Sequence, residues 1–321
     1  MRKIFHVIIP ALALAFVLSA VAARGSVGHA EAAEGRLKIV ATIFPQYDFA
    51  RAVAGDEADV AMLVRPGSEI HSFDPSPQDI MSMRNADVFI YIGGESDDWV
   101  DRILESMDTS KKTVIRLMDS VKPVEEETVE GMQPEDEEEG EEEEAAEYDE
   151  HVWTSPANAI KMIRAISDAL SGIDAKNADS YRVNSERYIN EIARLDGDFR
   201  SVVSSAKRKK IVFGDRFPFR YFADEYGLEY RAAFNGCNTE SECSAATMAY
   251  LINTVRDENI PAVYMIELSN GDIARTIAEQ TGANVLTLHS CQSIAKSDFE
   301  SGATYLSLME KNVEMLKEGL N

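Results

Sequence analysis

The sequence predicts an α/β protein of two lobes, each with a mostly parallel sheet flanked by helices, joined by one long rigid linking helix. From residue 37 onward, short β-rich runs alternate with amphipathic helical stretches, an order typical of parallel sheets. One long helical stretch over 177–206 interrupts this alternation, which begins again at residue 210. The chain has 321 residues, of which 45% are hydrophobic, so it can form more than one core.

The first lobe is expected over residues 35–176. Its predicted strands are 37–43, 58–64, 87–92 and 112–117, and its predicted helices are 45–54, one opening at Ser76-Pro77, 99–107, and one running from Ser155-Pro156 to about residue 170. In both Ser-Pro pairs the serine caps the helix and the proline occupies its first turn.

The linking helix is predicted over 177–206 because its apolar residues form a single helical stripe. These residues are Tyr181, Tyr188, Ile192, Leu195, Phe199 and Val202. A helix of this length spans about 45 Å, more than one lobe needs, so we expect it to act as a strut between the lobes.

The second lobe is expected over 207–321. Its predicted strands are 210–213, 228–234, 262–267 and 284–288, and its predicted helices are 221–226, 244–258, 271–280 and 302–316. The sequence shows no repeat between the two lobes.

The first 34 residues are expected to be a signal peptide and flexible leader, which predicts an exported protein, periplasmic or at the cell surface. Arg2 and Lys3 precede an apolar run over 4–23 that contains the small residues Ala20-Val21-Ala22. An uncleaved anchor helix is the competing interpretation. No cysteine lies in or just after this segment to carry a lipid.

Acidic residues outnumber basic ones by 56 to 32, for a formal charge of −24. This charge argues against nucleic acid and anionic membranes as partners. Residues 125–150 contain sixteen of the acidic residues and no Lys or Arg. With few apolar residues, the stretch over about 124–150 is predicted to be a disordered loop, either a solvated appendage or a weak collector of cations.

Three histidines remain beyond the leader, and each lies just after a strand or just before a helix. His71 and His289 follow strands, and His151 lies between the acidic stretch and a helix. Parallel sheets present ligand-binding groups at the carboxyl ends of their strands. Three converging imidazoles with one carboxylate would suit tetrahedral Zn²⁺, whereas isolated loop histidines more often make ordinary hydrogen bonds.

The cysteines are Cys237, Cys243 and Cys291. Their odd number allows one disulfide, from Cys291 to either of the others, and leaves one thiol. Buried free thiols are the alternative. Cys291 could also face the same side as His289 and offer a thiolate.

Two motifs resemble those of the zinc/manganese solute-binding proteins of ABC transporters, in particular the zinc-uptake branch. Residues 66–79 match P-G-x-x-x-H-x-x-x-P-x-P-x-D around His71, and residues 149–156 match D-x-H-x-W-x-S-P around His151. The resemblance extends over about 37–320 and implies the two-lobed fold with its linking helix. It also implies His71 and His151 as metal ligands.

The resemblance is weaker in the second lobe. The loop before Tyr226-Gly227-Leu228 lacks the expected His, which leaves Asp215 as the candidate, although Asp215 could instead pair with Arg216. The resemblance implies His289 in place of an aspartate ligand. It also implies Glu267, either as a ligand or as a residue that orients one.

The resemblance implies a binding protein rather than an enzyme, which captures Zn²⁺ between the lobes as a monomer and delivers it to an ABC permease. This ligand set favours Zn²⁺ over Mn²⁺ but does not exclude Cu²⁺. One alternative is a secreted zinc hydrolase with Glu69 or Glu267 as base; no H-E-x-x-H motif supports it. Another is a metal-dependent surface adhesin.

Overall fold

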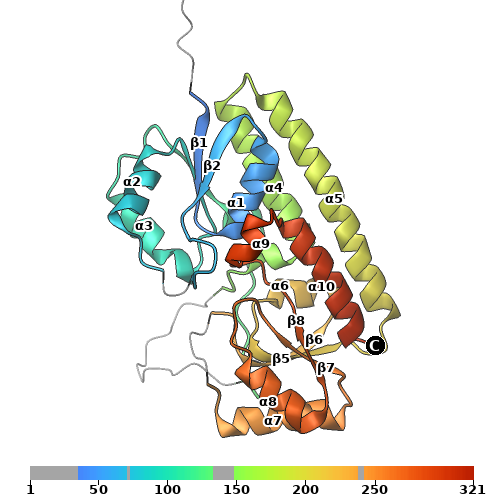
Figure 1. Cartoon of the computed structure of the whole chain (residues 1–321). Helices are drawn as coiled ribbons and strands as arrows, with labels where there is room; N and C mark the ends of the chain where they lie inside the picture. The colour runs from blue at the N-terminus through green and yellow to red at the C-terminus, as the bar shows by residue number, and fades with distance from the viewer. Residues whose placement is uncertain (1–34, 71–72, 133–147, 238–241) are drawn as a thin grey trace, which may run out of the picture. The chain divides into compact units, whose positions relative to one another are not determined.

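The computed structural model describes residues 35–70, 73–132, 148–237 and 242–321. Residues 36–321 form one compact unit (Figure 1). His71, the leader over 1–34 and the middle of the acidic stretch over 133–147 lie outside the described residues. In the parts of the chain that are described, no helix has both the length and the apolarity needed to cross a membrane.

The first lobe is built on four strands in the order β2-β1-β3-β4, and all of its pairs are parallel. Its elements are β1 (Leu37–Ala41), α1 (Phe44–Ala54), β2 (Ala58–Met62), α2 (Pro77–Asn85), β3 (Val88–Tyr91), η1 (Glu95–Asp97), α3 (Asp98–Glu105), β4 (Thr113–Arg116) and η2 (Leu117–Ser120), followed by η3 (Val152–Thr154) and α4 (Pro156–Ile173). The side chains of Ser76 and Ser155 accept the amides of Asp79 and Asn158, so both predicted Ser-Pro caps are confirmed.

The long helix is α5 (Ala178–Ser205), and the predicted apolar stripe along it is buried. It packs against α1 and α4 of the first lobe and against α6 and α10 of the second (Figure 1). One hydrophobic cluster contains residues of both sheets, such as Ile90 and Phe213, as well as residues of α5. The helix is therefore part of a core that both lobes share.

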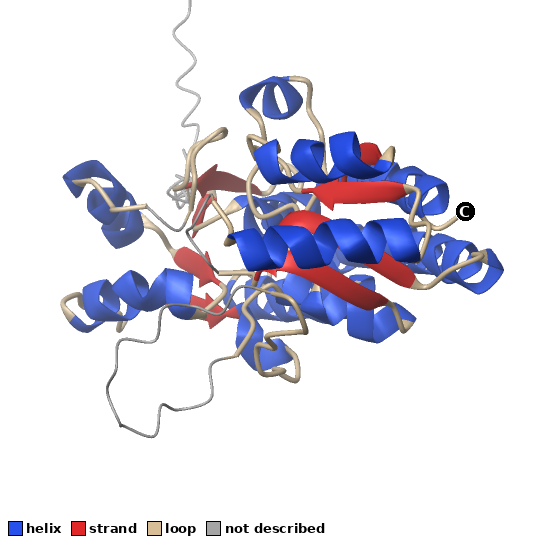
Figure 2. Cartoon of the chain, turned by 90° about the horizontal axis from the view of Figure 1, so that it is seen from below, coloured by secondary structure: helices blue, strands red, loops and turns tan. Residues whose placement is uncertain are grey.

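The second lobe repeats the topology of the first, with strand order β6-β5-β7-β8 and parallel pairs throughout. Its elements are β5 (Lys210–Arg216), α6 (Arg220–Tyr226), β6 (Glu229–Phe234), α7 (Ala245–Asp257), β7 (Ala262–Met265), α8 (Asp272–Thr281), β8 (Asn284–Thr287), α9 (Lys296–Glu300) and α10 (Tyr305–Gly319). Figure 2 shows helices on both sides of the strands. The shared strand order is a structural repeat that the sequence does not reveal.

The last helix begins later than predicted, at Tyr305 instead of residue 302. Thr304 caps it by accepting the amide of Ser307, whose own side chain accepts the Thr304 amide. The short helix α9 was not predicted from the sequence.

The prediction of disorder was wrong for the start of the acidic stretch, residues 124–132, which pack against the second lobe. Glu126 accepts a hydrogen bond from Asn235 (2.9 Å), and Glu127 pairs with Arg220 (2.5 Å). Met132 is buried in the main core. These glutamates have basic and amide partners about a hundred residues later in the chain, so their charge is compensated by tertiary contacts.

Candidate metal centre

The loop that leads to His71 contacts the second lobe. The side chain of Glu69 pairs with Arg216 at 3.0 Å, and the hydroxyl of Ser293 donates to the Ser68 carbonyl at 3.0 Å. Ile70, the last described residue before His71, is buried. The neighbours of the first predicted ligand therefore lie where the two lobes meet, although His71 itself is outside the described residues.

His151 is completely buried, between η3 and the end of the acidic stretch. Its Nδ1 lies 3.2 Å from Oδ1 of Asp149, which also accepts the His151 amide at 2.7 Å. Burial alone would lower the pKa of His151, but the adjacent Asp149 carboxylate offsets this, and the net pKa is raised. Nε2 has no hydrogen-bond partner among the described residues. It is therefore the ring nitrogen available to a metal.

The Trp of the second motif connects His151 to the loop of His289. Trp153 Nε1 donates to the Ser290 carbonyl at 2.8 Å, and its own carbonyl accepts the Tyr305 hydroxyl at 2.7 Å. The rings of Trp153 and His151 are 5.4 Å apart. This buried tryptophan fixes the position of the His151 loop relative to the second lobe.

His289 follows β8. The side chain of Asn312 in α10 accepts a hydrogen bond from the His289 amide and donates one to the His289 carbonyl, both at 2.7 Å. Its Nε2 is the other buried histidine nitrogen that lacks a partner in the described chain. Nδ1 accepts the Cys291 amide at 2.9 Å and lies 3.6 Å from Oε2 of Glu267. A neutral ring that binds metal through Nε2 carries its proton on Nδ1. Metal binding through Nε2 would therefore break the hydrogen bond from the Cys291 amide to Nδ1. The Nδ1 proton could then be donated to the Glu267 carboxylate.

Glu267 anchors the loop that carries His289. Its carboxylate accepts the Ser290 amide (2.7 Å), the Ser290 hydroxyl (2.6 Å) and the Ser293 amide (3.3 Å). Leu268 and Cys291, next to these groups, have positive φ values of 60° and 62°. Strained backbone of this kind persists where surrounding contacts over-determine it. These contacts support an orienting role for Glu267 over direct ligation.

Asp215 lies near the end of β5, and two backbone amides occupy its oxygens. Oδ1 accepts the Arg216 amide at 2.8 Å, and Oδ2 accepts the Ile266 amide at 3.3 Å. Burial raises the pKa of its carboxyl. A metal would have to compete with these bonds, and ligation by Asp215 stays a prediction.

Cys237 also lies at this site, although the sequence did not point to it as a ligand. Cys237 is half-buried, and its thiol, the Glu150 carboxylate and a His151 nitrogen lie within 4.8 Å of one another. Burial and the nearby carboxylates raise the pKa of Cys237 well above its ordinary value. All three cysteines are free, so none of the proposed disulfides is present.

A buried acid beside this cluster gives a prediction for stability. Asp97 Oδ2 accepts the amides of Ile92 (2.8 Å) and Gly93 (3.1 Å), yet burial raises the pKa of Asp97 to about 7. The folded state then binds the Asp97 proton more tightly than the unfolded chain, so stability falls as pH rises from about 4 to 7 and the loss is complete above that. Asp97→Asn keeps an acceptor oxygen and should raise the free energy of unfolding at pH 8 by on the order of a few kcal/mol.

Urea unfolding of the metal-free wild type and of Asp97→Asn at several pH values measures this difference. It should grow between pH 4 and pH 7 and then level off. A difference that is independent of pH would show that Asp97 is not held protonated by burial.

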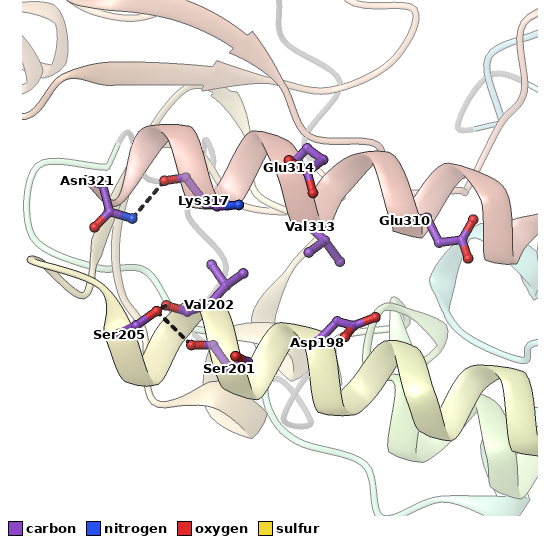
Figure 3. Close-up of a pocket in the computed structure, with 9 residues that line it drawn as sticks. All are labelled: Asp198, Ser201, Val202, Ser205, Glu310, Val313, Glu314, Lys317 and Asn321. Atoms are coloured by element: carbon purple, nitrogen blue, oxygen red, sulfur yellow. Dashed lines mark hydrogen bonds between the residues drawn. The ribbon is translucent and has the colours of Figure 1, made fainter.

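A groove lies elsewhere, between α5 and α10 (Figure 3). It has a volume of about 690 Å³, and its lining includes Asp198, Ser201, Glu310 and Lys317. It contains none of the histidines. A metal ion needs converging ligands rather than volume, so this groove is not the metal centre.

Comparison with known proteins identifies the family of this chain. Residues 39–319 match the family model described as zinc-uptake complex component A, periplasmic. The zinc-binding lipoprotein AdcA of Streptococcus pneumoniae is 34% identical over 287 residues, which cover 89% of this chain and 56% of AdcA. The chain thus spans about half the length of this curated relative.

Solved structures show the same fold. The Zn(II)-bound ZnuA-like domain of S. pneumoniae AdcA superposes with a TM-score of 0.73 at 31% identity, covering 89% of this chain and 99% of that domain. The laminin-binding protein Lmb of Streptococcus agalactiae, described as having adhesin and metal-transporting activity, gives 0.71 at 26% identity, with 89% and 100% covered. The chain belongs to the family of zinc-uptake complex component A proteins.

Proposed function

We propose that this chain is an exported solute-binding protein that captures Zn²⁺ between its lobes and delivers it to an ABC permease. The observation that carries the proposal is the pair of buried imidazoles, His151 and His289, whose Nε2 atoms lack partners among the residues that the structure describes. A buried polar atom without a partner is costly, and a bound cation would remove that cost. Zinc accepts neutral imidazole nitrogen readily, and His71 is proposed as a third ligand.

The contacts around the histidines suit reversible capture of a cation. Asp149 lies against Nδ1 of His151, and Glu267 lies close to Nδ1 of His289. A carboxylate behind each imidazole fixes the ring and makes its other nitrogen a better donor. Because α5 packs on both lobes, release is expected to involve small movements of the loops instead of a wide hinge opening.

Titration of the purified protein with Zn²⁺, Mn²⁺ and Cu²⁺, in competition with a chelator, tests the proposal. One tight Zn²⁺ per chain is expected, with Mn²⁺ bound at least about tenfold more weakly because it prefers oxygen donors. Failure to bind Zn²⁺ more tightly than Mn²⁺ would overturn the proposal. Cu²⁺ is expected to bind at least as tightly as Zn²⁺ by intrinsic affinity.

The hydrolase alternative finds no support in the contacts of its proposed bases. Glu69 is paired with Arg216, and Glu267 accepts three hydrogen bonds. A general base needs a carboxylate that can reach water on the metal. The family, moreover, is one of zinc-uptake proteins rather than enzymes.

An adhesin role is the second candidate, because Lmb combines adhesion with metal transport. Binding of the zinc-loaded and metal-free protein to immobilised laminin would test it. Equal binding to laminin and to an albumin-coated surface would exclude this role.

A further inference from the structure

We infer that Cys237 supplies a thiolate ligand to the captured metal, alongside His151 and Glu150. This inference rests on the proposed function and extends it by naming a ligand from the second lobe. Glu150, His151 and Cys237 form the one group of three metal-binding side chains found among the described residues. Glu150 is the last residue of the acidic stretch, His151 follows it directly, and Cys237 lies in the loop after β6, so a metal held by them would join the two lobes.

The distances suit a zinc ion after a small adjustment. In a tetrahedral site with bonds of about 2.0–2.3 Å, ligand atoms lie about 3.3–3.8 Å apart. The three donor atoms here lie within 4.8 Å of one another. Movements of about 1 Å would therefore bring the donor atoms to zinc-site separations.

The backbone at Gly236 holds Cys237 against the imidazole. A Cβ atom at Gly236 would lie 2.8 Å from His151 Cε1 and 2.9 Å from Nδ1, closer than side chains tolerate. The preceding residue, Asn235, is tied to Glu126 by a hydrogen bond of 2.9 Å. Glycine thus permits the close approach of this loop to the Cε1–Nδ1 edge of the imidazole, and the next residue, Cys237, lies within 4.8 Å of a ring nitrogen.

His151 supplies the independent sign of a missing ligand. Its side chain is completely buried, Asp149 occupies Nδ1, and Nε2 has no partner in the described structure. Glu150 is also buried, and its Oε2 is positioned by the Ser96 amide at 2.9 Å. Gly94 permits the close approach of Glu150, because a Cβ at Gly94 would lie 2.3 Å from Cβ of Glu150.

Binding replaces the S–H bond of Cys237 with an S–Zn bond, and the thiol proton passes to solvent or buffer. The metal remains Zn²⁺, so no oxidant or reductant is needed. A thiolate is a soft ligand that favours Zn²⁺ over Mn²⁺. Cys237 is therefore a residue that determines metal selectivity.

Cobalt(II) as a spectroscopic substitute for zinc tests the inference. The wild-type protein loaded with Co²⁺ should show thiolate-to-cobalt charge-transfer absorption in the near ultraviolet. Cys237→Ser and Cys237→Ala should lose this absorption, and their Zn²⁺ affinity should fall by about 10- to 100-fold, with a smaller change for Mn²⁺. The matched control is Cys243→Ser, which should keep the absorption and the affinity.

The outcomes separate this inference from the proposed function. Absence of the charge-transfer band in the wild type, with tight Zn²⁺ binding intact, would overturn the role of Cys237 alone. Retention of the band in folded Cys237→Ser would do the same. Absence of tight Zn²⁺ binding in the wild type would instead contradict the proposed function. Absence of the band in the wild type overturns the role of Cys237 even where a variant does not fold.

Discussion

Replacing His151 with alanine is expected to weaken Zn²⁺ binding by about 100-fold, or about 2.8 kcal/mol. The substitution removes the buried Nε2, which has no partner in the described part of the chain, while Asp149 keeps its bond to the backbone amide of residue 151. Competition with a zinc chelator of known affinity measures the change.

The control must separate lost ligation from lost stability, because His151 is completely buried. Met162→Ala serves this purpose, since Met162 is completely buried in α4 and is not a metal-binding candidate. It should lower the free energy of unfolding by about 2–5 kcal/mol and leave the affinity of the folded protein for Zn²⁺ unchanged. If His151→Ala and Met162→Ala reduced affinity equally, His151 would not be a ligand.

Replacing Phe199 with alanine is expected to lower the free energy of unfolding by about 3–5 kcal/mol. Phe199 is completely buried in the C-terminal part of α5, and its ring lies near those of Phe222 (4.9 Å between centroids) and Tyr226 (5.4 Å). Because α5 belongs to a core that contains residues of both sheets, the two lobes should lose stability together, in one transition. Urea unfolding followed by tryptophan fluorescence and by circular dichroism measures both effects.

Val183→Ala is the matched control on the same helix, because Val183 is 68% exposed. Its effect should be within about 0.5 kcal/mol. Two separate transitions for the Phe199 variant, or equal effects of the two substitutions, would show that α5 does not unite the lobes.

The sequence was sufficient for features that depend on local pattern. The apolar stripe of α5 repeats every three or four residues, and the structure buries it. Parallel strands followed from the alternation of short apolar runs with helices. The rule that ligands follow strands also singled out His289 as a candidate, since it needs only the end of β8, and ligation by His289 stays a prediction.

Features that depend on distant partners could not be predicted in this way. Glu126 and Glu127 looked like part of a solvated loop because Asn235 and Arg220 are about a hundred residues away in sequence. Cys237 was not singled out as a candidate ligand, although it follows β6 by three residues and so satisfies the same strand-end rule as His289. Applying that rule to every Cys as well as every His would have named Cys237 as a candidate ligand.

The central claim is that Zn²⁺ is captured by His151 where the two lobes meet. Anomalous diffraction at the zinc edge, from crystals of the zinc-loaded protein, tests it most directly. One strong anomalous peak is expected at about 2.0–2.1 Å from Nε2 of His151. A zinc peak bound only to acidic side chains within residues 133–147, with none at His151, would contradict it.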